Sequence, residues 1–381
     1  MKTTKRPRLF NKMFAPIPFS AVNKVVNQYE GDKYRKTHSV LEFIRLVSLS
    51  LLTEASSLRE TLYQVHVNPK MGSLVNPQDK PISRSQAYKI NNSLDPKMLG
   101  DIFNKIYKSI QLKYNIKRDN VYAIDSTFIV SRSKTCSIVT KGYNPTRAKR
   151  RTGVKAHLIM DITHRLPTRI AISSGNRADA TTLHMLNALG KETVRVFDKG
   201  YRQYKTFVKY IEANEWFVTP RVSRSQPDVI KEFDLSQKDR DSDVIADQLC
   251  HLGSNKNNRG YHKYQIRCIT IFHADNSDPR HHVLMTNMMD ISAAEVVDIY
   301  AQRNMIEVDI HHLKQLLGIS KLKSYSEQGI LNQWILALIC YLLIWIFERT
   351  YYKDLGFWKT AKFIRYNLTE TWYSIKLLAP T

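Results

Sequence analysis

The sequence predicts a mixed α/β fold preceded by a helical N-terminal part, and three patterns support this prediction. Residues 40–52 and 99–112 carry apolar side chains at helical spacing. Residues 121–130 are rich in β-branched and aromatic side chains, which is typical of a strand. From that point short apolar runs alternate with amphipathic segments, which indicates a sheet with helices packed on it.

The N-terminal part, residues 1–118, is expected to be a small basic helical domain that binds DNA. Residues 1–120 contain 21 Lys and Arg against 9 Asp and Glu, an excess that suits a nucleic-acid partner. Residues 81–89 are typical of a loop that enters a short helix. Two interpretations of residues 83–94 stay open: a helix-turn-helix, or one helix of an ordinary bundle with a solvated basic face.

The central and C-terminal parts are expected to supply the sheet. The predicted elements are strand 121–130, a hairpin of residues 156–163 and 169–174, helix 180–189, strand 193–197, helix 204–213 and strand 216–219. Residues 223–280 are polar, with turn signals at 255–260 and 275–279, and are predicted to be β-rich. A strand over 283–286 then precedes a long helix over 292–317, begun by Ser292 with Glu295 three residues later, and a buried helix over 332–352.

Composition restricts the class of partner. The 381 residues include 58 Lys and Arg against 34 Asp and Glu, a net charge of +24, so a polyanion is expected and nucleic acid is the first candidate. A membrane is a weaker candidate, because the longest apolar run, 334–347, is 14 residues and is typical of a buried helix. Residues 1–12 are basic and polar, unlike a signal peptide. The four scattered cysteines (Cys136, Cys250, Cys268 and Cys340) favour a reduced, cytoplasmic location without disulfides.

Two aspartates follow or interrupt apolar strands and are candidate site residues. Asp125 lies within the strand 121–130, where a carboxylate is costly unless it is paired or binds a metal. Asp198 directly follows the strand 193–197, and sites in α/β sheets assemble at such strand ends. The alternative for each is structural: a helix cap, or the start of a turn.

A third acidic candidate, Glu307, lies on the predicted helix 292–317. At about 100° per residue, Tyr300, Arg303, Glu307 and Lys314 share one side of that helix. The alternative is a solvated face with an Arg303–Glu307 ion pair. Two strand-borne aspartates and a helix-borne glutamate can hold two divalent ions, and their oxygen ligands favour Mg²⁺ or Mn²⁺. Arg303, Lys314 and the Tyr300 hydroxyl would then contact phosphates beside the metals.

At these residues the sequence resembles the insertion-sequence DDE transposases of the IS-four type. Their YREK signature is matched by Tyr300-x2-Arg303-x3-Glu307-x6-Lys314. The motifs Ile-Asp-Ser-Thr at 124–127, Asp-Lys-Gly-Tyr at 198–201 and Leu-Met-Thr-Asn at 284–287 are also similar to theirs. The resemblance runs from about residue 120 to residue 323. One residue departs from it: Asn304 stands where the family commonly has Trp.

The resemblance implies an RNase H-like catalytic core with a β-rich insertion. The core would comprise residues 119–222 and 281–381, with the insertion at 223–280 between them. Asp125, Asp198 and Glu307 would be the catalytic residues and the metal ligands, and Tyr300, Arg303 and Lys314 would grip the transposon end. Family members move DNA by cut-and-paste, some through a hairpin intermediate, and Asn304 places the hairpin route in doubt.

A basic segment follows the first predicted catalytic strand. Residues 131–155 contain eight Lys and Arg and no acidic residue. Contact with the DNA backbone is favoured over a solvated loop, and the residues expected to make it are Arg147, Lys149, Arg150 and Arg151. His157, next along the chain, is equally compatible with the core and with a phosphate contact.

The sequence therefore predicts a metal-dependent transposase that cleaves double-stranded DNA at transposon ends and joins them to a target. Because two ends must be held together, a dimer on DNA is expected. Two alternatives stay open. One is an RNase H-like nuclease that cuts without strand transfer. The other is a non-catalytic DNA-binding protein derived from a transposase, against which the three intact carboxylates argue.

Overall fold

A computed structural model describes most of the chain. The described residues are 7–33, 38–76, 81–116, 120–131, 133, 135–144, 149–185, 193–221, 228–253, 259–273, 280–316, 318, 324–353 and 355–376. Internal contacts divide the chain into two compact units. Unit 1 comprises Met1–Lys117, Phe128–Val154 and Ile310–Thr381, and unit 2 comprises Arg118–Thr127 and Lys155–Asp309.

Unit 1 is mainly helical, as predicted for the N-terminal part. Its helices are α1 (Leu9–Phe14), α2 (Phe19–Gln28), α3 (Val40–Leu52), α4 (Leu58–Val67), α5 (Pro69–Val75), α6 (Arg84–Ser93), α7 (Pro96–Lys113), α12 (Glu327–Tyr351), α13 (Phe357–Tyr366) and α14 (Trp372–Ile375). It also contains strand β2 (Thr140–Asn144), which pairs antiparallel with the first residues of β3 (Lys149–Asp161).

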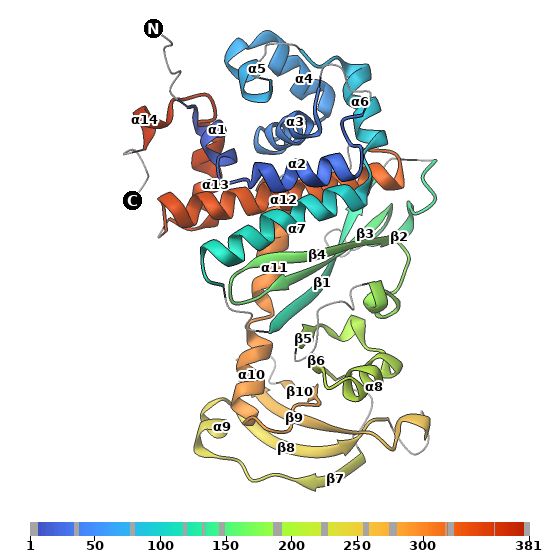
Figure 1. The fold of residues 1–381 in the computed structure, drawn as a ribbon. Coiled ribbons are helices and arrows are strands. Elements are labelled where there is room, and N and C mark those ends of the chain that lie inside the picture. The colour runs from blue at the N-terminus through green and yellow to red at the C-terminus, as the bar shows by residue number, and fades with distance from the viewer. Residues whose placement is uncertain are drawn as a thin grey trace. The chain divides into compact units, whose positions relative to one another are not determined.

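Helix α12 is the centre of the core of unit 1. It packs against α3, α6, α7 and α13, and Figure 1 shows α7 running alongside it. Helix α12 is long and apolar enough to cross a bilayer, but 94% of its most apolar window is buried inside the protein. The interpretation of this segment as a core helix is therefore confirmed, because apolar side chains all round a helix are removed from water by neighbours on every side.

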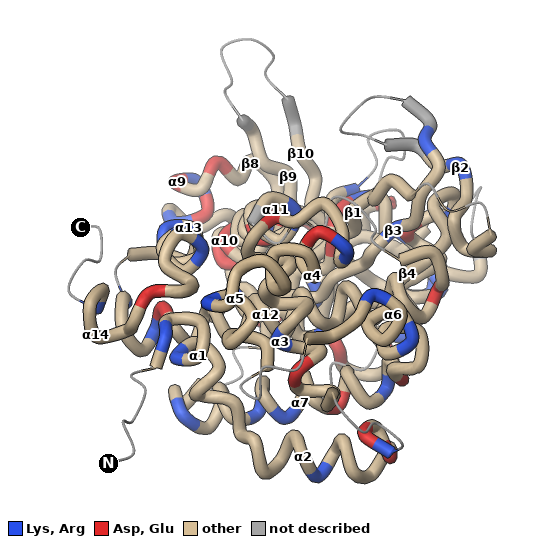
Figure 2. Tube along the Cα trace, turned by 90° about the horizontal axis from the view of Figure 1, so that it is seen from above, with Lys and Arg blue, Asp and Glu red and all other residues tan. Residues whose placement is uncertain are grey.

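The short helices of unit 1 begin where the sequence supplies caps. Ser39 and Glu42 form a capping box at α3, and Ser83 and Gln86 form another at α6. Each box satisfies backbone N–H groups that the first turn leaves without partners. Helix α6 exposes Arg84, Tyr88 and Lys89; Figure 2 marks basic positions on α6, which has no acidic residue.

Unit 2 is built on a mixed sheet. Its further elements are β4 (Leu166–Ser174), η2 (Asp179–Met185), β5 (Val194–Phe197), η3 (Lys199–Tyr201), α8 (Tyr204–Glu212), β6 (Trp216–Pro220), β7 (Asp228–Glu232), α9 (Gln237–Asp241), β8 (Val244–His251), η4 (Arg259–Tyr261), β9 (Gln265–His273), β10 (Arg280–Thr286) and α10 (Ala293–Ala301). Strand β1 (Val121–Val130), strand β3 and helix α11 (Asn304–Leu316) contribute to both units. The strand order is β3-β1-β5-β6-β10-β9-β8-β7, with β4 on β3.

Within this sheet β1, β5 and β6 run parallel, whereas β6, β10, β9, β8 and β7 pair antiparallel. The prediction of a mixed α/β fold is confirmed, and residues 223–280, predicted to be β-rich, contain β7, β8 and β9. Helix α8 packs on β6, and Phe197, Phe207 and Phe217 stack between them. This aromatic core anchors the end of β5, where Asp198 follows.

Two predicted helices differ from the observed ones. The helix expected over 292–317 is interrupted: α10 ends at Ala301 and α11 begins at Asn304. Between them the N–H groups of Arg303, Met305 and Ile306 each donate to the carbonyl three residues earlier, so this turn is tighter than an α-helix and changes its phase. The helix expected over 180–189 is instead the 3₁₀ helix η2, and residues 186–192 lie outside the described part.

Candidate active site

Asp125 and Asp198 lie side by side because of the strand register. Ile124 of β1 pairs in parallel with Phe197 of β5, and each aspartate is the next residue of its chain. Adjacent strands are about 4.8 Å apart, so the two aspartates stand next to each other at this edge of unit 2. The parallel pairing thus brings together two residues that are distant in sequence.

Asp125 is in an unusual electrostatic environment. Its side chain is 19% exposed, and burial raises its pKa to about 7. The backbone N–H of Ser126, 2.8 Å from Oδ1, and the nearby Arg303 oppose that increase, whereas Asp198 and Glu307 add to it. A raised pKa caused by desolvation and by like charges is common at functional sites. The other two predicted carboxylates therefore both act on Asp125.

Asp198 caps the turn that follows β5. Its Oδ1 accepts a hydrogen bond of 2.8 Å from the Gly200 N–H, and its carbonyl accepts one of 3.4 Å from Thr219 Oγ1 of β6. The structural alternative for Asp198, a turn-forming cap, is thus real. It coexists with the position beside Asp125, since a carboxylate has more acceptor sites than this cap occupies.

Glu307 is placed by the first turn of α11. Its side chain is 55% exposed and pairs with Arg303, whose Nη2 lies 2.6 Å from Oε1. Arg303 also approaches Asp125, with Nη1 4.0 Å from Oδ2, and lies 6.0 Å from the centre of the Tyr300 ring. Burial alone would lower the pKa of Arg303, but the neighbouring Tyr300, Asp125 and Glu307 raise it. Arg303 therefore lies between Glu307 and Asp125.

Tyr300 completes this side of the site. Burial raises the pKa of its hydroxyl, Arg303 lowers it, and the nearby Asp198 and Glu307 add to the increase. Tyr300, Arg303 and Glu307 thus gather on one side, as predicted. The cause differs from the predicted one, because the tight turn at residues 302–303, and not one continuous helix, directs these side chains.

The donor chemistry of the site suits a hard divalent cation. The three carboxylates offer oxygen ligands only, which Mg²⁺ and Mn²⁺ prefer. A cation would favour the ionised form of Asp125, which burial and, to a smaller extent, Asp198 and Glu307 disfavour. Within the described ranges, no three His, Cys, Asp or Glu side chains are gathered as a finished metal site. Glu307 is instead paired with Arg303.

The other predicted DNA contacts are only partly described. Lys314 lies half-buried in the last turn of α11 and belongs to unit 1. Arg147 lies outside the described residues, and only the backbone of Lys149 and Arg150 is described, in β3. Arg151, also in β3, is partly exposed. Asn304 is exposed at the start of α11.

His157 belongs to the core, which resolves its two interpretations. It is fully buried, with Nδ1 3.0 Å from the Tyr201 hydroxyl and Nε2 2.8 Å from Ser173 Oγ. Asp179, at the start of η2, is a fourth carboxylate near the site, and sequence reasoning missed it. Its only signal was a place before a short apolar segment, which is equally typical of a helix cap.

Comparisons with known proteins identify the family of the chain. Residues 116–343 match the family model described as the transposase DDE domain, and residues 5–70 match a domain of unknown function. A Geobacillus stearothermophilus protein, named as a transposase for insertion sequence element IS5377, is 26% identical over 52% of this chain and 51% of its own length. A Sinorhizobium fredii protein, named as transposase y4zB, is 28% identical over 52% and 54%.

The chain thus spans about half the length of these curated relatives. Among solved structures, the piggyBac transposase synaptic complex with hairpin DNA aligns with a TM-score of 0.47 at 12% identity, covering 98% of this chain and 82% of that one. The family match covers more than half of the chain and includes Asp125, Asp198 and Glu307. This protein belongs to the transposase DDE domain family.

Proposed function

We propose that this protein cuts DNA at the ends of an insertion sequence and joins them to a target, with Asp125, Asp198 and Glu307 as its catalytic carboxylates. The supporting observation is the parallel register that sets Asp125 beside Asp198, with Glu307 close enough to raise the pKa of Asp125. The names of the two curated relatives support the same activity.

The three carboxylates would hold two Mg²⁺ or Mn²⁺ ions. Such ions activate the attacking water or 3′-hydroxyl and stabilise the leaving oxygen of the phosphodiester. The residues of the chain contribute the placement: Asp125 and Asp198 from adjacent strands, and Glu307 from α11. Since Glu307 is paired with Arg303, an ion at Glu307 would compete with the guanidinium.

Several basic groups would contact DNA phosphates. Tyr300, Arg303 and Lys314, which match the YREK signature of the IS-four type, would bind near the cleaved bond. The segment with Arg147, Lys149, Arg150 and Arg151 would follow the backbone. In unit 1, the exposed Arg84, Tyr88 and Lys89 of α6 would take part in binding a terminal inverted repeat.

The remaining organisation follows from this activity. Residues 1–118 would form the DNA-binding domain, residues 119–222 and 281–381 the catalytic core, and residues 223–280 its insertion. Two copies would hold the two transposon ends together, and the protein would act at the bacterial nucleoid because its substrate is DNA.

The direct test is strand transfer. A DNA end with a pre-cleaved 3′-hydroxyl is incubated with target DNA and Mg²⁺, and joined products are measured for the wild type, Asp125→Asn, Asp198→Asn and Glu307→Gln. We expect joining by the wild type and none by the three variants, with DNA binding retained. If Glu307→Gln retained full joining, the catalytic assignment would be wrong. Cleavage without joining by the wild type would instead indicate a nuclease, and DNA binding without either reaction a non-catalytic protein.

A further inference from the structure

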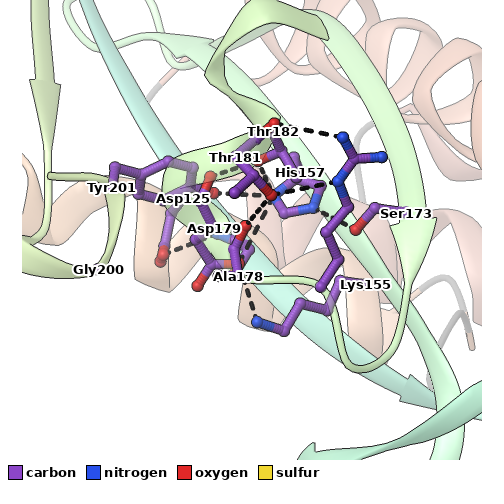
Figure 3. Close-up of polar contacts among 12 residues, drawn as sticks. Asp125, Lys155, His157, Ser173, Ala178, Asp179, Thr181, Thr182, Gly200 and Tyr201 are labelled. Carbon is purple, nitrogen blue, oxygen red and sulfur yellow. Dashed lines mark hydrogen bonds and ion pairs between the residues drawn. The ribbon is translucent and has the colours of Figure 1, made fainter. Parts of the chain in front are cut away.

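A polar network that includes the buried side chains of His157 and Tyr201 lies beside Asp125 in unit 2 (Figure 3). Its central group is the hydroxyl of Tyr201, a fully buried residue of η3, three positions after Asp198. That hydroxyl lies 3.0 Å from His157 Nδ1 of β3. Asp125, Asp179 and Asp198 are all near enough to act electrostatically on Tyr201.

The hydrogen bonds around His157 have a definite direction. The Ser173 hydroxyl donates to the Ser174 carbonyl, so the Ser173 oxygen accepts from His157 Nε2–H at 2.8 Å. Burial, with the nearby Lys155 and Arg177, lowers the pKa of His157 to about 3, so the ring is neutral and Nδ1 is an acceptor. The hydroxyl of Tyr201 is therefore the donor to Nδ1.

The same Tyr201 oxygen is joined to the other catalytic strand. The Ser126 hydroxyl donates a hydrogen bond to it, which opposes the increase in the pKa of Tyr201 that burial causes. Ser126 directly follows Asp125, and its backbone N–H binds Asp125 Oδ1. The Tyr201 hydroxyl thus contacts Ser126, the residue after Asp125, while Tyr201 itself belongs to the turn that begins with Asp198.

Asp179 approaches Asp198 from η2. Its Oδ1 accepts a hydrogen bond of 3.0 Å from Lys155 Nζ. Its Oδ2 lies 3.6 Å from the point that a Cβ on Gly200 would occupy, and Asp198 Oδ1 lies 2.9 Å from the same point. Because Gly200 has no side chain, the carboxylates of Asp179 and Asp198 can both lie close to the place where its Cβ would be. Lys155 offsets the negative charge that Asp179 brings there.

We propose that Tyr201, held by His157, and Asp179, held by Lys155, are positioning residues that fix the Asp198 turn against Asp125. This inference rests on the proposed function. Tyr201 sets the spacing of the two strand ends through Ser126, and Asp179 limits the orientation of the Asp198 carboxylate at Gly200. Neither residue has to contact the DNA.

Tyr201→Phe is the first test, because it removes one oxygen and keeps the aromatic packing. The matched control is Tyr210→Phe, which removes another buried hydroxyl in the same core. The measurements are kcat for joining a pre-cleaved end, the Kd of that end, and Mn²⁺ affinity by electron paramagnetic resonance. Loss of an orienting partner typically weakens metal binding or activity by about 10- to 100-fold. We expect Tyr201→Phe to show that loss in both kcat and Mn²⁺ affinity, with the Kd of the DNA end unchanged. The control Tyr210→Phe is expected to match the wild type in all three measurements.

Asp179→Asn and Lys155→Met test the second half of the proposal. Each is expected to lower Mn²⁺ affinity by about 10-fold, and the double variant to be no worse than Asp179→Asn, because the two side chains act through one contact. Gly200→Ala gives an independent route that keeps the hydrogen-bonding groups, since its Cβ would press on Asp198 Oδ1. It should also lower Mn²⁺ affinity.

The outcomes separate this proposal from the proposed function. If Asp198→Asn abolishes joining and Mn²⁺ binding while Tyr201→Phe, Asp179→Asn and Gly200→Ala match the Tyr210→Phe control, the positioning roles are wrong and the function stands. If Asp198→Asn itself leaves both unchanged, the catalytic site is wrong and the positioning roles with it. Should Tyr201→Phe unfold, as judged by circular dichroism, the Asp179→Asn and Gly200→Ala results decide.

Discussion

Asp125→Asn is expected to make the metal-free protein more stable at neutral and alkaline pH, although it removes one of the proposed catalytic carboxylates. The Asp125 pKa is raised from an ordinary value of 3.8 to about 7, so the folded protein holds this proton more tightly than the unfolded chain does. Ionised Asp125 therefore costs stability above pH 7, and the cost disappears as the pH falls toward 4. Asparagine has the same shape and no charge, so it removes the cost.

The size of the effect follows from the pKa difference. Each pH unit corresponds to about 1.4 kcal/mol, so the difference from 3.8 to about 7 sets an upper limit of about 4 kcal/mol. Since the carboxylate is 19% exposed and its surroundings can relax, we expect about half of that limit, ~2 kcal/mol at pH 8. At about pH 5 the variant and the wild type should differ by less than about 1 kcal/mol.

The assay is urea unfolding of both proteins in buffer with a metal chelator at several pH values. Hydrogen exchange of peptides from residues 121–127 and from β5 reports on unit 2 separately, because a chain with two units need not unfold in one step. Glu232→Gln, on the exposed face of β7, is the control for loss of a carboxylate. If Asp125→Asn were no more stable than the wild type at pH 8, ionised Asp125 would not be a cost to stability and the reasoning would be refuted.

Three further predictions concern packing, a buried ion pair and DNA binding. Gly100→Ala, in a part of α7 where an added Cβ meets nothing within 4 Å, should stabilise the protein by about 0.5–1 kcal/mol. Gly153→Ala, whose Cβ would lie 2.1 Å from the Ile129 carbonyl oxygen, should destabilise it by about 1–3 kcal/mol or more. A variant with the melting temperature of the wild type would contradict the prediction for that variant. Asp247→Asn breaks the buried pair with Arg267 Nε, 2.8 Å from Oδ1, and should cost about 3–5 kcal/mol in urea unfolding; a cost below about 1 kcal/mol would mean that the pair is not desolvated. Arg84→Ala should reduce the slope of log Kobs against log salt for DNA binding by about 1, and an unchanged slope would exclude Arg84 from the DNA surface.

Much of the fold was predictable because local patterns determine it. Strand β1 was predicted with its observed bounds, and Ser292 caps α10 with Glu295 as expected. The break at residues 302–303 was not predictable from periodicity, since the apolar and polar spacing continues across it. The tight turn at residues 302–303 forms because of how the rest of the fold holds α10 and α11.

Local sequence patterns were enough to select the residues that are the candidates for the chemistry. The Asp125, Asp198 and Glu307 motifs, the spacing from Tyr300 to Lys314 and the strongly basic composition are all local, and they pointed to the family before any contact was known. Glu307 was also predicted to have an ion pair with Arg303 as its structural alternative, and that pair is observed.

How these residues meet depends on contacts between distant parts of the chain. The parallel register of β1 and β5 sets Asp125 beside Asp198, and a register is a property of two strands that no single segment encodes. Burial, which raises the pKa of Asp125, also depends on neighbours far away in sequence. Asp179, Lys155, His157 and Tyr201 come from three different elements, η2, β3 and η3, so their hydrogen bonds became visible only when the chain was folded.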